Sequence, residues 1–155
     1  MRTKYFIMTA LLCAVLVSGC EYFMETWSPA FIENHSDKTI WACGVLPGRK
    51  YGSWTAVPND GKEVEFFVTS GSFKRILSDE RHLVVYITDE EPKEDINSSM
   101  TESEIMQKFN IIKKYELTRN DWWNVGVMTY PPAEKMSGVQ MWPPYGESVE
   151  QDESK

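Results

Sequence analysis

The run Leu83-Val84-Val85-Tyr86-Ile87 is apolar at nearly every position. Short apolar runs of this length are typical of strands that are covered on both faces. We therefore expect residues 81–88 to form the central strand of a sheet, with the other elements arranged around it.

Short β-type segments lie on both sides of this central run. In the segment 62–69, Val64, Phe66 and Val68 alternate with polar residues, as in a strand that is buried on one face. The polar group 35–38 separates two such segments and predicts a hairpin turn. Seven strands are expected, over residues 30–34, 39–46, 51–57, 62–69, 81–88, 109–115 and 124–130.

Two short helical elements are expected late in the chain. Thr101 and Glu104 have the spacing of a capping box and predict a short helix that ends near Lys108. Thr118 and Asp121 repeat this spacing and predict about one further turn of helix. The pattern as a whole predicts a mostly β fold, a compact antiparallel β-sandwich or barrel-like domain with one short helix and one helical turn.

The composition changes after Pro131, where two Pro-Pro pairs and an acidic C-terminal end leave few apolar residues. Such a segment buries too little apolar surface to offset its loss of conformational entropy. We expect residues 30–131 to form a single β-rich domain and residues 132–155 to form a disordered, Pro-rich acidic tail. An apolar island at 141–145 within this tail could dock into a groove of a partner protein.

The first 19 residues have the composition of a secretory signal peptide. Arg2 and Lys4 precede an uncharged run of thirteen residues that ends at Val17. A helix of that length covers about 20 Å, which is short of the roughly 30 Å hydrocarbon core of a bilayer. We therefore expect the segment to be removed by cleavage between Gly19 and Cys20.

Cys20 follows the small residues Ser18 and Gly19 and is expected to carry the lipid. The pattern 17–20 resembles the lipobox of bacterial lipoproteins, which implies a diacylglycerol on the Cys20 thiol. Two or three acyl chains give lasting membrane attachment, at about 0.8 kcal/mol per buried CH₂. Residues 20–29 are expected to form the anchor and a short linker. Glu21, beside the lipidated residue, favours the outer membrane over the inner membrane.

The charge of the mature chain limits its partners. Removal of Arg2 and Lys4 with the signal leaves 14 basic and 23 acidic residues, a formal charge of −9. Nucleic acids and anionic headgroups attract basic surfaces, so we expect neither nucleic-acid binding nor direct electrostatic adsorption to lipid. The membrane contact is expected to come from lipid on Cys20.

A longer pattern connects several of these segments. Asn34-His35-Ser36, residues 82–89, the capped helix, residues 110–118 with Asp121 and Trp123, and Thr129-Tyr130-Pro131 resemble a group of small lipoproteins of Bacteroidetes. The resemblance covers roughly residues 30–131, and the chain departs from it by continuing for 24 residues beyond Pro131. It implies a lipoprotein with a β-rich fold and assigns no catalytic residue.

Few residues suggest catalysis, a cofactor or a metal site. His35 and His82 lack the neighbouring His or Cys of a zinc site, and Cys43 lies in an apolar strand-like run typical of a buried thiol. The acidic loop that begins at Asp89 lacks the regular Gly-centred spacing of a calcium loop. Residues 69–73 do not match Gly-x-Ser-x-Gly, and we interpret them as a turn. No catalytic residue, metal ligand or cofactor is assigned.

Tryptophan is the remaining distinctive feature, with six in the chain. Core packing is the simplest role for Trp41 and for one residue of the Trp122–Trp123 pair. Trp54, Trp122 and Trp123 are the candidates for exposed, ligand-binding aromatics. We expect a non-catalytic, lipid-anchored module of the cell envelope that binds a protein or glycan partner. The alternatives are a glycan-binding accessory lipoprotein that uses these tryptophans, and an envelope hydrolase.

Overall fold

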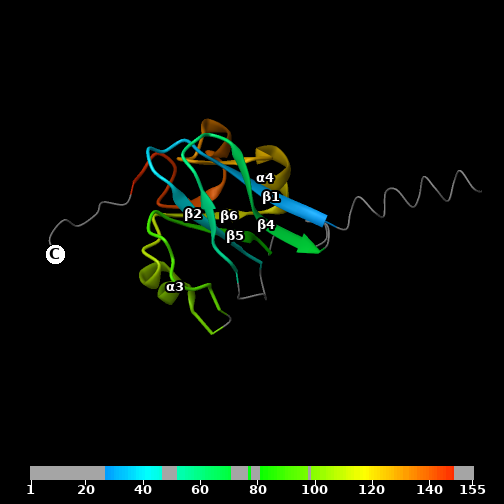
Figure 1. Cartoon of the computed structure of the whole chain (residues 1–155). Coiled ribbons are helices and arrows are strands. Elements are labelled where there is room, and N and C mark those ends of the chain that lie inside the picture. The colour runs from blue at the N-terminus through cyan, green and yellow to red at the C-terminus, as the bar shows by residue number, and fades with distance from the viewer. Residues whose placement is uncertain (1–26, 47–51, 71–76, 78–80, 98, 149–155) are drawn as a thin grey trace, which may run out of the picture.

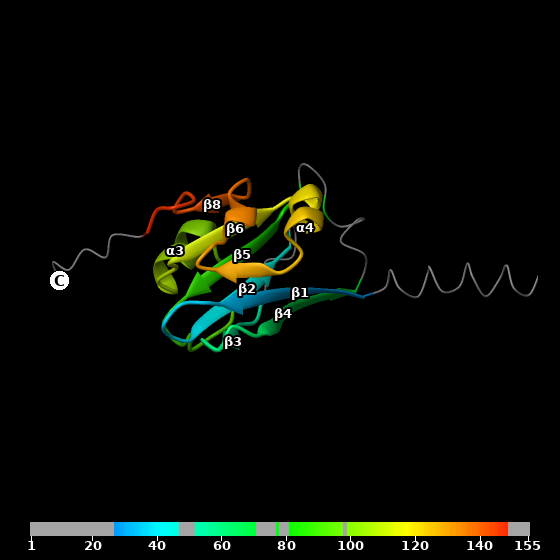
Figure 2. The same cartoon turned by 90° about the horizontal axis from the view of Figure 1, so that it is seen from above.

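The computed structural model describes residues 27–46, 52–70, 77, 81–97 and 99–148. The chain is mostly β, with two sheets packed face to face as in a β-sandwich (Figures 1 and 2). This confirms the predicted sandwich, whereas the described strands form no closed barrel. No helix in the described part of the chain is long and apolar enough to cross a bilayer.

The smaller sheet has three strands in the order β4-β1-β7. These strands are β4 (Glu63–Ser70), β1 (Trp27–Asn34) and β7 (Met128–Tyr130). β1 pairs antiparallel with β4 and parallel with β7, so the expectation of a purely antiparallel fold is wrong at β7. β1 also begins at Trp27, so the expected linker over 20–29 overlaps the first strand.

The larger sheet has five antiparallel strands in the order β3-β2-β5-β6-β8. They are β3 (Thr55–Val57), β2 (Ile40–Val45), β5 (Leu83–Thr88), β6 (Lys113–Leu117) and β8 (Gln140–Trp142). β5 lies in the middle, and both of its faces are covered. Leu83, Val85 and Ile87 face the main core, while Tyr86 faces a second cluster. The predicted central strand is therefore confirmed.

The second cluster lies on the face of the larger sheet that points away from the smaller sheet. It contains Cys43, Tyr86, Ile96, Ile105 and Phe109. Ile105 comes from helix α3 (Glu102–Lys108), and Figure 2 shows this helix beside the larger sheet. The domain thus has a partial third layer.

Both helices begin at the predicted caps. In α3, the Thr101 backbone N–H donates to the Glu104 carboxylate at 2.6 Å, and the Glu104 N–H donates to the Thr101 hydroxyl. Thr118 and Asp121 exchange the same pair of bonds at the start of α4 (Arg119–Val125). These bonds satisfy N–H groups that a helix leaves unpaired at its first turn.

The hairpin predicted at residues 35–38 is wrong, because β1 and β2 belong to different sheets. The buried side chain of Asn34 stabilises the crossing between them. Its amide donates to the carbonyls of Lys38 and Val57, and its oxygen accepts from Ser36. A buried amide with its donors and its acceptor satisfied holds this connection without strand pairing.

The predicted disordered tail is also wrong for residues 132–148. A 3-10 turn, η1 (Glu134–Met136), follows β7, and β8 then pairs with β6 at the edge of the larger sheet. Met136 is fully buried in the main core, and Val139 is nearly so. Met141 packs partly against the same core. These three apolar residues, Met136, Val139 and Met141, attach the Pro-rich segment to the domain.

Candidate functional site

The three tryptophans proposed as ligand-binding residues do not come together. Trp54 lies just before β3, an edge strand of the larger sheet, whereas Trp122 and Trp123 lie in α4, which follows β6 on the far side of β2 and β5. Trp122 packs against the main core, so its predicted exposure is wrong, and Trp54 is half-buried. Only Trp123 is strongly exposed, at 69%.

Trp54 instead shares a groove with Trp41, a residue expected in the core. Trp41 lies on β2 opposite Ala56 of β3, on the face that points away from the main core. The aromatic groove, as we call it, has a volume of about 390 Å³. It is lined by Trp41, Trp54, Ala56, Glu91, Pro92, Lys93, Glu94 and Asp95.

The acidic loop after β5 forms the second wall of this groove and is attached to the segment before β3. Asp95 accepts hydrogen bonds from the Ser53 hydroxyl at 3.1 Å and from the Trp54 backbone N–H at 3.3 Å. Gly52 and Ile96 exchange two backbone hydrogen bonds of 3.1 and 3.0 Å. Two segments that are distant in sequence are therefore joined beneath the groove.

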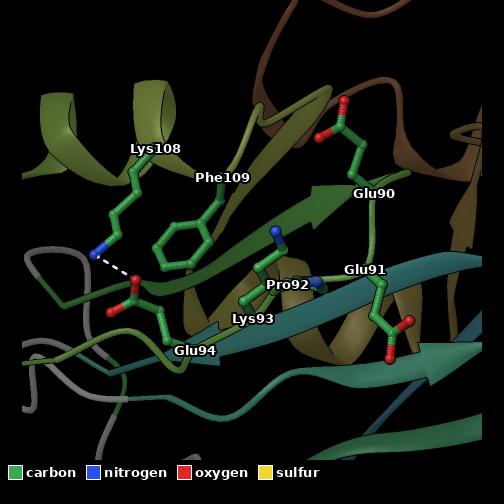
Figure 3. A pocket seen from close by; sticks show the side chains of 7 residues that line it. All are labelled: Glu90, Glu91, Pro92, Lys93, Glu94, Lys108 and Phe109. Carbon is green, nitrogen blue, oxygen red and sulfur yellow. Dashed lines mark ion pairs between the residues drawn. The ribbon is translucent and has the colours of Figure 1, made fainter.

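A second hollow of about 260 Å³ lies on the other side of the same loop. Figure 3 shows its lining residues, among them Phe109 and the ion pair between Lys108 and Glu94 at 2.8 Å. The Phe109 ring contacts Trp54, with ring centroids 5.2 Å apart at 51°. This tilted pair lies between the two hollows and supports the Trp54 ring from behind.

Most charged groups around the groove already have partners. Glu94 pairs with Lys108, Asp95 is hydrogen-bonded to Ser53, and Glu90 accepts from Asn110. Among the described residues, Glu91 and Lys93 line the groove without an ion pair. The groove thus offers one free carboxylate acceptor, one free ammonium donor and two indole rings.

The indole Nε1 of Trp54 is buried and has no hydrogen-bond partner among the described residues. A buried donor without an acceptor costs about 1–3 kcal/mol. The packing of the Trp54 ring against Phe109 and the second cluster therefore has to offset the free-energy cost of the unpaired N–H.

The titratable residues considered for catalysis lie apart from one another. Burial raises the pKa of the Cys43 thiol to about 12, which leaves it protonated and unreactive near neutral pH. His35 lies 3.0 Å from Glu33, and His82 lies 3.7 Å from Glu116 in the other sheet. No group of three His, Cys, Asp or Glu residues within the described segments is placed to hold a metal ion.

Two predicted features lie outside the described residues. These are the cleavage and lipidation site at Gly19 and Cys20, and residues 71–73 of the predicted Ser/Gly turn. The tail island lies within the described part, where Met141 packs on the core while Trp142 and Tyr145 are exposed.

The alternation of residues along β2 could have indicated from the sequence that Trp41 lies outside the main core. Ile40 and Ala42 face the main core, so Trp41 and Cys43 must face the opposite side of the sheet. The proximity of Glu91 and Lys93 had no such signal, because a loop that returns across a sheet has no periodicity.

Comparison of the chain with protein-family models, with curated proteins and with solved structures finds no match.

Proposed function

We propose that this protein is a lipid-anchored, non-catalytic binding module of the cell envelope, more suited to the outer than to the inner membrane. The observation that carries the proposal is the pattern 17–20, which follows a short basic region and an uncharged run of thirteen residues. This order of features matches a signal peptide that ends in a lipidated cysteine.

The position of β1 supports this arrangement. β1 begins at Trp27, seven residues after Cys20. Even a fully extended chain of that length reaches only about 25 Å, at roughly 3.5 Å per residue. A lipid on Cys20 therefore keeps the domain next to the bilayer surface.

The lipid anchor can be tested by replacing Cys20 with Ser. We expect Cys20→Ser to abolish incorporation of labelled palmitate and to leave residues 1–19 attached, because serine lacks the thiol that accepts the diacylglycerol. The matched control is Cys43→Ser, which changes the buried cysteine and should keep full labelling. Palmitate in the Cys20→Ser protein would contradict the proposal.

The aromatic groove supports a non-catalytic role. Its free groups, Glu91 and Lys93, have opposite charge, and the pKa of the nearby Cys43 thiol is raised by burial. A nucleophile with its base, or a pair of carboxylates whose environments separate their pKa values, would instead favour catalysis. Hydrolysis of an envelope substrate that is lost in Glu91→Gln would favour the hydrolase alternative.

The second candidate function is glycan binding, and Trp41 and Trp54 in one groove favour it. Sugars present an apolar face, which indole rings can cover, and hydroxyls that both donate and accept hydrogen bonds. Glu91 provides an acceptor and Lys93 a donor beside the two rings. This mixture fits a neutral sugar better than an ion of either sign.

Glycan binding can be measured with an array of neutral and envelope-derived oligosaccharides. We expect Trp41→Ala to weaken binding about tenfold or more, which corresponds to about 1.4 kcal/mol. Glu91→Gln tests the same groove without changing ring packing and should also weaken binding. Trp123→Ala, in α4, is the matched control and should bind as the wild type does. Equal binding by all four proteins would refute glycan binding in the aromatic groove.

A further inference from the structure

If Cys20 carries lipid, the side of the domain where β1 begins faces the membrane. β1 and β7 run parallel, with Ile32 opposite Met128, so the residues just before β7 lie toward the start of β1. Those residues form α4, and both views show α4 at the same end of the domain as the beginning of β1 (Figures 1 and 2).

Trp123 projects from α4 at this end and has the largest exposed fraction, 69%, among the large apolar side chains of the described segments. Its neighbour Trp122 packs on the main core, so the helix is fixed to the domain. Arg119 strengthens this attachment by donating two hydrogen bonds, of 3.0 and 2.7 Å, to the carbonyl of Leu77. Trp123 is therefore exposed on a firmly attached helix.

Carboxylates gather at the opposite end of the sandwich. The connections that meet there are 35–38, 58–62 and the residues that directly follow β5, as the strand registers require. Their acidic residues are Asp37, Asp60, Asp89, Glu90 and Glu91, against the two lysines Lys38 and Lys62. The exposed residues of α4, by contrast, are Asn120, Trp123 and Asn124, which carry no charge. Contact through α4 therefore keeps the acidic end away from the lipid headgroups.

We propose that Trp123 inserts into the headgroup region of the bilayer that carries the lipid on Cys20. Tryptophan is enriched at membrane interfaces, because its ring is apolar while its N–H can still reach a polar partner. The domain then stands with α4 against the membrane and the aromatic groove facing outward, where a ligand can reach it.

The lipid explains why one side chain is enough for this contact. A single indole ring binds a bilayer weakly by itself, but a short tether keeps the domain at an effective concentration on the order of millimolar. Trp123 therefore orients a domain that the lipid has already brought to the surface. The inference rests on the proposed lipid anchor and adds the orientation of the domain.

The test uses the full lipidated protein reconstituted into phosphatidylcholine vesicles, with or without bromine on the acyl chains near the headgroups. Bromine quenches nearby indole fluorescence. Trp27, the tryptophan nearest to Cys20 in sequence, is replaced by Phe in every protein so that it does not contribute. We expect brominated lipid to quench this background protein and Trp123→Ala to remove most of the quenching.

Trp142→Ala is the matched control, since Trp142 is also exposed, at 40%, but lies on β8 away from α4. It should retain the quenching. Equal quenching with and without Trp123, or its loss in Trp142→Ala as well, would overturn the inference. Flotation of the vesicles separates this failure from failure of the anchor: a protein that floats without Trp123-dependent quenching refutes the orientation alone. A protein that does not float refutes the lipid anchor.

The Trp123→Ala variant is expected to fold normally. The side chain is mostly solvent-exposed, and alanine is the best helix former, so α4 should persist. An unchanged circular dichroism spectrum and an unchanged midpoint of thermal unfolding check this point. Should α4 unfold, Trp123→Gln tests the same contact by replacing the ring with a polar side chain of good helix propensity.

Discussion

Deletion of residues 132–155 is expected to leave the rest of the chain largely unfolded. The deletion removes β8 from the edge of the larger sheet and Met136 from the main core. Loss of a buried Met side chain alone costs about 2–5 kcal/mol. Total stabilities of domains are only about 5–15 kcal/mol, so the combined loss is comparable to the whole.

The same segment also supplies hydrogen-bond acceptors to Lys113. Lys113 is 3% exposed, and its ammonium donates to the carbonyls of Pro143 at 2.6 Å and Pro144 at 3.4 Å. Deletion removes these two acceptors together with the residues that cover the ammonium, so water can take the place of the carbonyls. Burial lowers the pKa of Lys113, and the negative charge of Glu147 acts in the opposite direction.

Urea unfolding followed by circular dichroism measures the effect of the deletion. The matched control removes only residues 149–155 and keeps β8, Met136 and both proline carbonyls, so it should unfold at the urea concentration of the full chain. Met136→Ala should lower the free energy of unfolding by about 2–5 kcal/mol, whereas Lys135→Ala, at the exposed neighbour, should change it little. A stable domain that ends at Pro131 would show that the segment is dispensable.

Replacement of Gly52 by alanine is expected to destabilise the domain by about 1–3 kcal/mol, as overpacking of a filled site typically does. A Cβ at this position would lie 2.6 Å from the Cys43 Sγ and 2.8 Å from the Gly44 carbonyl oxygen. Both distances are shorter than real Cβ contacts. The strand segment must therefore shift, which strains the two backbone hydrogen bonds between Gly52 and Ile96.

Gly138→Ala is the matched control, because nothing lies within 4 Å of the added Cβ there. Chemical denaturation of both variants provides the comparison. Adding Cys43→Ala to Gly52→Ala removes the contact with sulfur but not the contact with the backbone oxygen, so only part of the lost stability should return. Equal stability of Gly52→Ala and Gly138→Ala would contradict the predicted clash.

Loss of the Gly52–Ile96 pairing should also affect the aromatic groove. This pairing lies next to Trp54 and Asp95, which form parts of the two walls. If the groove binds glycans, Gly52→Ala should weaken binding in a protein that is still folded.

Local signals identified most of the secondary structure, but the strand expected over 109–115 lies at 113–117 as β6, and the strand expected over 124–130 shrinks to β7 because α4 continues to Val125. The apolar run around Val85 lies in the centre of a sheet, and both Thr caps begin helices at the predicted residues. These features are encoded within a few neighbouring residues, by side-chain period and by hydrogen bonds to the nearest N–H groups. The prediction of a hairpin after β1 was wrong because turn residues show where a chain reverses but not which sheet it joins next.

The sequence by itself determined the mostly β class, the central strand, the two capped helices and the pattern that predicts a lipid on Cys20. The tertiary structure alone decided that residues 132–148 belong to the domain and that Trp41 joins Trp54 beside Glu91. It also decided that α4, the helix that carries Trp123, lies at the end where β1 begins. The reason is physical: periodicity and capping act over a few residues, whereas the burial of Met136 and the walls of the aromatic groove depend on segments far apart in the chain.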